Sequence, residues 1–407
     1  MFLSALVSQL EADGSLTVDL TDEHGPVLRF GSLAEGMPWS RLEGGQWVPT
    51  DHDYAVLLVS DAHERRPELP VQRYLASLTP DEFATLNRVR YLQATALQLI
   101  ARWSEARDLL KANPLLLWMV ADRYAADPGS RHRVPEMLLK PQKVLLEWVL
   151  GEPVNPTQVR FLSKVILTAG DRAALAGLQR VAGNKGLVSK LRHWRVVPSE
   201  FLPLVLEAPV VAELGWLREE AAVIQNDYDA ARVVHRYRRL LRDTVRMIGL
   251  VNAAVQEAPI DLRAYRSVKS VEVLHDRLLT VARKLGWARL LEADVAPTQV
   301  FPAPPIPSDE RFSAITNVAE IIQEAERMKH CVVTRAADVA AGVCALYRVN
   351  VAGERATLEL SLSPSGEPLA IDQFRLACNA EPSAAAWGAA QQWLAEGRRR
   401  WRERPAG

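Results

Sequence analysis

The 407-residue sequence has little cysteine and no long apolar run. Its three cysteines, Cys331, Cys344 and Cys378, form no CxxC pair, which argues against a disulfide scaffold and favours a reducing compartment. No apolar run approaches the ~18 residues of a membrane span, and the apolar start of the chain is too short and interrupted for a signal peptide. We therefore expect a cytoplasmic protein with no membrane partner.

An excess of either charge is also missing. Lys+Arg and Asp+Glu both number 49, so the global field is close to neutral, and any affinity for nucleic acid has to come from a local patch. No P-loop, GxSxG motif or paired CxxC is present, which leaves NTPase, α/β-hydrolase and zinc-ribbon functions without support. The hydrophobic content of 48% and charged content of 24% are typical of a globular protein.

Apolar periodicity predicts an α+β fold that is mostly α and has four parts. Residues 1–62 alternate apolar and polar positions between Gly-rich breaks, as β-strands do. Residues 79–292 have helical periodicity and recurring helix starts, which predict an irregular helical array, with a repeat solenoid as the alternative. Residues 293–310 are rich in proline and predict a semi-rigid linker. Residues 311–407 follow as an α+β domain.

The last domain has a readable order of elements. Ser308-Asp309-Glu310 is a helix-start signal, and a second short helix is expected from about Met328 to Gly342. Three strand-like runs follow at 343–351, 356–363 and 369–376, and the short turns between them favour an antiparallel meander. A basic helix from about 383 to 402 ends the domain.

The second and third of these strands each have one polar face. Thr357 and Glu359 alternate with leucines on one strand, and Gln373 and Arg375 share a face of the other, with Asn379 just beyond it. If the leucine face packs on the helices, these polar side chains converge on one surface. We expect Thr357, Gln373, Arg375 and Asn379 to bind a ligand there.

This pattern resembles the PcfJ-like family, which is found largely on conjugative plasmids, phages and other mobile elements. The resemblance covers about 315–380. It rests on the positions Met328, His330, Cys331, Val332, Gly342, Thr357, Glu359, Gln373, Arg375 and Asn379. It implies a role in plasmid transfer (conjugation) or in phage defence and related defence against mobile elements.

The chain departs from the family pattern at two places. Arg335 stands where the family tends to have an aromatic residue a few positions after His-Cys-Val. Leu376-Ala377-Cys378 stands where the family tends to have a glycine between the Arg and the Asn. A glycine there allows close approach of the backbone to a ligand, so its loss puts that ligand in doubt.

His330, Cys331 and Glu359 are the candidate catalytic residues. Cys331 near the start of a helix can be a thiolate nucleophile, but neighbouring His330 points about 100° away on a helix, and a buried structural cysteine is the favoured alternative. His330 and Glu359 form a better pair, either as acid–base machinery or as a structural hydrogen bond. No usual metal-ligand spacing occurs, so we expect neither a metal nor another cofactor.

Two arginine-rich stretches are candidates for nucleic-acid binding. One helical face gathers the arginines of the run at 231–246, and the final helix ends in a second basic cluster. The candidates are Arg232, Arg236, Arg239, Arg242, Arg246, Arg399 and Arg400. A solvated helix face and a soluble tail are the alternative interpretation.

Together these features favour a binding module for nucleic acid or for a partner protein encoded nearby, acting in plasmid transfer or in defence against mobile elements. The alternative is an enzyme whose pocket holds His330, Cys331 and Glu359 and whose substrate is unknown. A purely structural partner of a second chain is a third possibility.

Overall fold

A computed structural model describes residues 7–21, 25–50, 56–59, 69–167, 170–223, 227–255, 259–291, 295–296, 298–363 and 365–403. It confirms an α+β fold that is mostly helical. The chain divides into two compact units, Met1–Arg238 and Arg239–Gly407. The boundary falls inside helix α14 (Asp227–Ala254).

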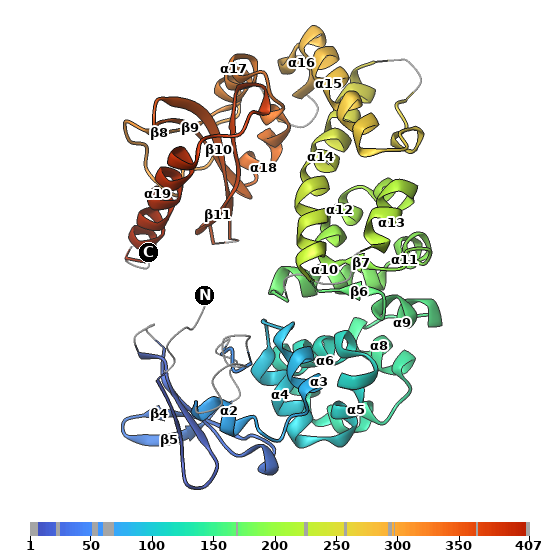
Figure 1. Cartoon of the computed structure of the whole chain (residues 1–407), viewed down its shortest axis with the longest axis vertical. Coiled ribbons are helices and arrows are strands. Elements are labelled where there is room, and N and C mark those ends of the chain that lie inside the picture. Colours follow the sequence, from blue (N-terminus) through green and yellow to red (C-terminus); the bar gives the residue numbers. More distant parts are fainter. Residues whose placement is uncertain are drawn as a thin grey trace. The chain divides into compact units, whose positions relative to one another are not determined.

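The first unit begins with the expected β-rich segment. Five antiparallel strands follow one another in chain order, as Figure 1 shows in blue. They are β1 (Val7–Leu10), β2 (Leu16–Asp19), β3 (Val27–Phe30), β4 (Trp39–Glu43) and β5 (Gln46–Pro49). The alternating residues Leu16, Val18 and Leu28 are buried on one face, which is the period-two pattern of the sequence.

The remainder of the first unit is a helical array. Its α-helices are α2 (Pro70–Tyr74), α3 (Pro80–Asn87), α4 (Gln93–Arg102), α5 (Ser104–Ala112), α6 (Pro114–Ala126), α7 (Val134–Leu138), α8 (Gln142–Leu150), α9 (Pro156–Leu162), α10 (Arg172–Gly183), α11 (Lys185–Leu191), α12 (Leu202–Glu207) and α13 (Gly215–Ala222). The predicted starts at Thr79 and Asn155 are capping boxes, and Asn113 caps α6. The parallel pair β6 (Val165–Ile166) and β7 (Val197–Pro198) is an element that the sequence pattern did not predict.

The second unit contains the remaining helices and a four-stranded antiparallel sheet in the order β11-β10-β9-β8. Its elements are the later part of α14, α15 (Val268–Leu285), α16 (Trp287–Leu291), β8 (Phe312–Ala314), α17 (Val318–Met328), the 3-10 turn η7 (Val332–Arg335), α18 (Ala336–Ala340), β9 (Cys344–Val351), β10 (Glu354–Leu362), β11 (Pro368–Leu376), the short turn η8 (Ala377–Asn379) and α19 (Ala384–Arg402). The three predicted strands and the final helix are therefore present close to their expected bounds.

Two helix starts predicted in this unit were wrong. The residues after Ser308 form strand β8, because Ser308 and Asp309 hydrogen-bond to the backbone of that strand, and the helix begins later, at Val318. The second helix does not begin at Met328. Met328 ends α17, and Lys329 follows in the left-handed conformation that breaks the helix (φ 53°).

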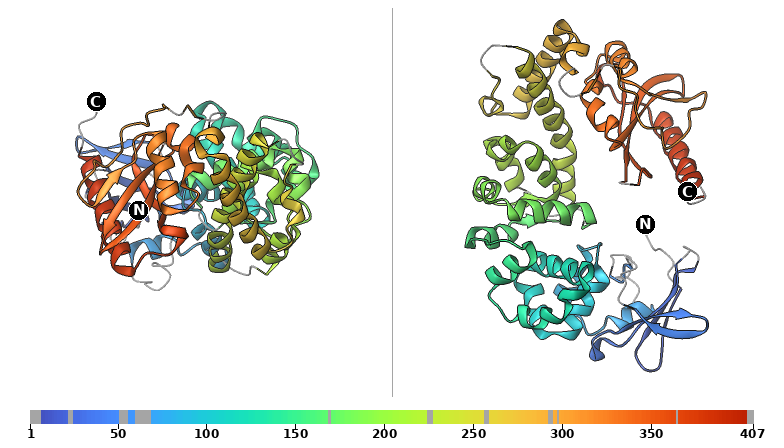
Figure 2. Two further views of the ribbon diagram at one scale, coloured as in Figure 1. Left: turned by 90° about the horizontal axis from the view of Figure 1, so that it is seen from above. Right: turned by 180° about the vertical axis from the view of Figure 1, so that it is seen from behind.

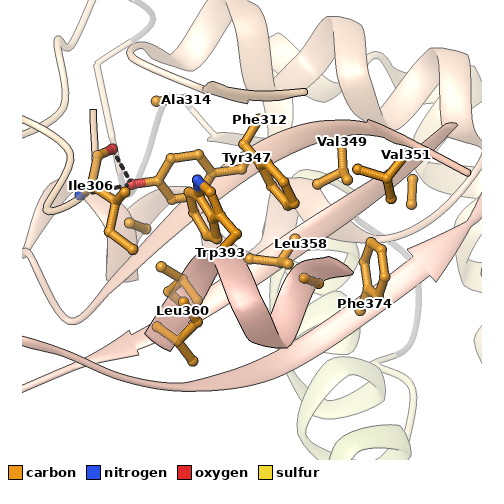
Figure 3. Close-up of a cluster of buried hydrophobic side chains, with 14 of the residues drawn as sticks. Ile306, Phe312, Ala314, Tyr347, Val349, Val351, Leu358, Leu360, Phe374 and Trp393 are labelled. Atoms are coloured by element: carbon orange, nitrogen blue, oxygen red, sulfur yellow. Dashed lines mark hydrogen bonds between the residues drawn. The ribbon is translucent and has the colours of Figure 1, made fainter. Parts of the chain in front are cut away.

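One face of the sheet holds the apolar core of the second unit. Trp393 of α19 stacks on Phe312 at a centroid distance of 4.2 Å and meets Tyr347 edge-on at 4.8 Å. Figure 3 shows these rings with Leu358, Leu360 and Phe374 between the sheet and α19. The leucine face therefore packs on a helix, as expected.

The opposite face of the sheet is covered as well. Helix α17 contacts β10 and α18 contacts β9, so the polar side chains of this face lie inside the unit. Figure 2 shows the sheet between α19 and these helices from a second direction. Thr357 and Glu359 are each only 5% exposed. The sequence pattern predicted these two side chains on a surface, whereas the structure buries them. No helix among the described residues has the length and apolarity to cross a membrane.

Candidate functional site

A small polar cavity lies on the covered face of the sheet in the second unit. It brings together all seven residues that the sequence marked as catalytic or ligand-binding candidates. Its lining is Asp243, His330, Cys331, Val332, Thr334, Arg335, Leu346, Thr357, Glu359, Gln373, Arg375 and Asn379. Residues as far apart in the sequence as Asp243 and Asn379 therefore share one site.

The strand register explains how the sheet supplies its part of the cavity. Glu359 pairs with Gln373, and Thr357 pairs with Arg375, so these four side chains point to the same face. A β-bulge follows, since Leu360 pairs with Ile371 and skips Asp372. The bulge directs Asp372 toward the polar face beside Gln373, where strict alternation would have turned it away.

Arg335 is the central charge of the site. Its side chain is 2% exposed and binds two carboxylates: its Nε lies 3.1 Å from an oxygen of Glu359, and its Nη2 donates to Asp243 of α14. Burial opposes the charge, but these carboxylates outweigh it and raise the pKa of Arg335. The guanidinium is thus a permanent cation that joins the sheet to α14.

Cys331 does not have the surroundings of a nucleophile. Its thiol is buried and donates to Asp243 at an Sγ–Oδ2 distance of 3.6 Å. Burial, and then the negative charge of Asp243, raise the pKa of the thiol well above its usual value. The thiolate is therefore disfavoured at neutral pH, which supports the structural interpretation of this cysteine.

His330 is held in one tautomer by a chain of two hydrogen bonds. The hydroxyl of Thr357 donates to Glu324 of α17 at 2.6 Å and lies 2.9 Å from Nε2 of His330. Because a hydroxyl has a single hydrogen, Nε2 has to be the donor to Thr357. Nδ1 is consequently a bare acceptor, and it has no hydrogen-bond partner among the described residues.

The buried position also keeps His330 uncharged. Its side chain is 3% exposed, and burial lowers its pKa to about 4. At neutral pH the ring is therefore a neutral imidazole with a free lone pair. The sequence pattern predicted an interaction between His330 and Glu359. In the structure His330 hydrogen-bonds to Thr357, and Glu359 accepts a hydrogen bond from Arg335. Burial raises the pKa of Glu359, although Arg335 opposes the change.

Gln373, Arg375 and Asn379 form the outer rim of the cavity. Gln373 and Arg375 are half-buried, and Asn379 is exposed. Arg375 pairs with the exposed Glu381, and burial together with the nearby charge of Arg239 lowers the pKa of its guanidinium. The rim thus presents amide and guanidinium groups, with two positive charges close enough to repel each other.

The rim also contains strained backbone. Cys378 and Asn379 have positive φ angles of 56° and 60°. Such angles are usual for glycine and tolerated by asparagine, but they are unfavourable for cysteine. Cys378 thus adopts a conformation that is typical of glycine.

The volume of the cavity limits what it can hold. It encloses about 20 Å³, which is room for about one water molecule. A larger ligand therefore has to bind at the rim or displace side chains. Among the described residues, no group of three or more His, Cys, Asp or Glu side chains could hold a metal ion.

Two of the three α14 candidates whose side chains the structure describes, Arg242 and Arg246, face acidic groups. Arg242 lies 3.0 Å from a carboxylate oxygen of Asp372, and Arg246 pairs with Asp338. Arg239 donates to the backbone carbonyl of Asp372. The side chains of Arg232 and Arg236 lie outside the described part of the structure. At the other end of the unit, Arg399 and Arg400 are exposed on α19, and Arg400 pairs with Glu396.

Several charged residues of the site were not predicted from the sequence, among them Asp243, Glu324, Arg335, Asp338 and Asp372. Asp243 lies in the arginine-rich helix and is the only acidic residue between Asp229 and Gln256. This single acidic residue in a basic and apolar stretch was the feature of the sequence that could have indicated a site residue. Arg335 stood out only as a departure from the family pattern. Glu324 has the ordinary appearance of a polar residue on an amphipathic helix, and it is nevertheless 1% exposed.

Comparisons with known proteins add no identification. No protein-family model, curated protein or solved structure matches the chain.

Proposed function

We propose that the chain is a nucleic-acid-binding protein whose second unit contacts a nucleotide at the rim of the polar cavity. The observation that carries the proposal is the grouping of Gln373, Arg375 and Asn379 around one opening. Amide and guanidinium groups are the side chains that hydrogen-bond base edges and phosphates. The resemblance to PcfJ-like proteins suggests the setting, which is plasmid transfer or defence against mobile elements.

The charges of the rim support an anionic ligand. The charge of Arg239 lowers the pKa of the Arg375 guanidinium, so a phosphate near both would relieve repulsion, and it would compete with Glu381, the exposed partner of Arg375. The inner part of the cavity favours a neutral group of the ligand, because the charge of Arg335 is already neutralised there by Asp243 and Glu359. A nucleotide offers both kinds of group, with a charged backbone and a neutral base edge.

The test is binding of labelled DNA and RNA, in single-stranded and duplex form, to the full chain by fluorescence anisotropy. Replacing Arg375 with Gln should weaken binding about tenfold and reduce its salt dependence, as loss of one charged contact does. The matched control is Arg266→Gln, because Arg266 is exposed in the same unit, does not line the cavity and makes no ion pair among the described residues. Equal affinity of both variants and the wild type would contradict a role for the rim.

A second candidate, hydrolysis of the bound nucleic acid, is favoured by the bare Nδ1 of His330. A water molecule in the cavity can donate to Nδ1, and attack on a phosphodiester would transfer that proton to the imidazole. The new P–O bond forms as the bond to the departing oxygen breaks, and that oxygen takes a proton from solvent. Thr357 and Glu324 would hold the ring in the required tautomer.

The two candidates separate experimentally. Cleavage products that appear with wild type and disappear with His330→Gln, while binding persists, would establish the hydrolytic function. Nucleic acid that is bound and recovered intact leaves the binding function alone. Iodoacetamide should leave Cys331 unmodified in the folded protein at pH 8, and rapid modification there would restore a thiol mechanism.

A further inference from the structure

The first unit contains a segment with a strong local charge. Between positions 153 and 199 there are eight basic residues and a single acidic one, Asp171, which gives a formal charge of +7 in a chain whose net charge is zero. The basic residues are Arg160, Lys164, Arg172, Arg180, Lys185, Lys190, Arg192 and Arg195. This is the kind of local patch that a neutral chain needs to attract a polyanion.

Most of these charges are exposed and lack acidic partners. Six of the eight side chains are exposed, and Lys190, which pairs with Glu213 at 2.6 Å, is the one member with an ion pair among the described residues. The arginines of α14 differ, since Arg242 and Arg246 are directed at Asp372 and Asp338. The exposed arginines of the first unit's segment are therefore available to phosphate.

The fold gathers part of this charge along two adjoining hollows. The first, of about 950 Å³, is lined by Arg180 and Lys185, and the second, of about 470 Å³, is lined by Lys190 and Arg192. Both include Gly186 near the start of α11, so they meet there. The result is a concave surface around the α10–α11 turn.

Contacts inside the unit keep the charges at this surface. Lys164 donates to the backbone carbonyl of Trp194 at 3.0 Å, which ties the end of α9 to the segment after α11 and holds a further positive charge beside Arg192. The hollows also contain carboxylates, and two of these are already neutralised: Asp127 by Arg123 and Glu213 by Lys190. Asp122 accepts a hydrogen bond from Gln179, and Glu152 lies against Gly183. The lining of the first hollow has three basic and three acidic side chains, so the excess of positive charge, two over both hollows, lies in the second hollow, where Lys190, Arg192 and Arg218 face Glu213.

We infer that the α10–α11 surface of the first unit binds the sugar-phosphate backbone of nucleic acid. This inference rests on the proposed function and adds the surface that supplies most of the affinity. Exposed Arg and Lys side chains neutralise phosphates without reading sequence, so the surface supplies affinity and orientation rather than specificity. The net charge of the chain is zero, so attraction to a polyanion has to come from a local surface of this kind.

The experiment compares two triple variants of the full chain. The test variant is Arg180→Gln, Lys185→Gln and Arg192→Gln. The control variant is Arg133→Gln, Arg266→Gln and Lys269→Gln, which removes the same charge from exposed positions outside the segment. Circular dichroism and thermal melting establish that both variants fold. Anisotropy is then measured with duplex DNA, single-stranded DNA and single-stranded RNA over a range of salt concentrations.

The test variant should lose at least tenfold in affinity, and the slope of log K against log[salt] should become shallower by about two to three, because about one unit is lost for each phosphate contact. The control variant should bind as the wild type does. If the wild type binds none of the probes, the proposed function fails and this inference fails with it. If the wild type binds and the two triple variants are equally affected, the α10–α11 surface alone is overturned.

Discussion

The two faces of the C-terminal sheet are both buried, and they are stabilised by opposite chemistry. Under α19, Trp393, Phe312 and Tyr347 pack with aliphatic side chains, and the contacts are mainly non-directional, apart from the hydrogen bonds between the Tyr347 hydroxyl and the backbone of Ile306. On the other face, Arg335 and its carboxylates are paired and hydrogen-bonded, and each group depends on a specific partner. An apolar face tolerates repacking, whereas a buried ionic network is destabilised strongly by loss of any one member.

The same comparison separates structure from function. On the apolar face, the Tyr347 hydroxyl is already hydrogen-bonded to the backbone of Ile306. The polar face contains Nδ1 of His330 and Nη1 of Arg335, both buried and without a hydrogen-bond partner among the described residues. Unsatisfied buried groups are destabilising, so their presence next to a cavity indicates a place for water or ligand.

The largest expected effect comes from Arg335→Met. The substitution removes the cation nearest to the buried carboxylates of Asp243 and Glu359 and leaves them Arg242 at 3.9 and 3.8 Å. We expect a loss of about 3–5 kcal/mol in the free energy of unfolding. Urea denaturation at pH 7 measures it. Adding Glu359→Gln to this variant should recover part of the lost stability, because it removes one of the two buried negative charges. If the double variant is no more stable than Arg335→Met, the loss is due to packing and not to charge.

Trp393→Ala tests the apolar face and should cost roughly 3–4 kcal/mol, because it removes a large buried ring and leaves a cavity. Urea denaturation should give this loss almost unchanged from pH 5 to pH 8, since no titrating group is involved. A pH-dependent loss would mean that the two faces are coupled, and the contrast between them would fail.

The pH dependence of the polar face is set in part by His330. The pKa of His330 is lowered to about 4 from an ordinary 6.5. Between these two pH values His330 is protonated in the unfolded chain and neutral in the folded protein. Stability from this residue is therefore present above pH 6.5 and is lost as the pH falls toward 4, by up to ~1.4 kcal/mol per pH unit. His330→Gln keeps a donor for Thr357 and cannot titrate, so its unfolding free energy should fall less steeply over this window. Parallel curves would contradict a buried neutral imidazole.

The smallest effect is expected at the rim. Cys378 has a positive φ of 56°, and glycine adopts such angles without strain. Cys378→Gly should therefore stabilise the folded state by up to ~1 kcal/mol, offset in part by the greater freedom of glycine in the unfolded chain. Thermal melting measures the gain. Cys344→Gly is a matched control on strand β9, where glycine should destabilise because a buried side chain is lost.

The sequence by itself determined much of the local structure. Capping residues such as Thr79 and Asn155 act through their own backbone neighbours, so helix starts were predictable. The alternation along β10 sets which side chains share a face, and this alone was enough to group Thr357 with Glu359. Thr357, Glu359, Gln373 and Arg375 were chosen as candidates from such alternation, and His330, Cys331 and Asn379 from their local sequence and the resemblance to the PcfJ-like pattern.

The tertiary structure decided the rest, because partners far apart in sequence are set by packing rather than by periodicity. Whether the polar face was a surface or an interior depended on α17, α18 and α14 covering it, and this converted Arg242 from a nucleic-acid candidate into a partner of Asp372. The choice of Arg335 as the partner of Glu359 followed from the same packing. The charge of the segment 153–199 was in the sequence, but only the fold shows that Arg180 and Arg192 line adjoining hollows.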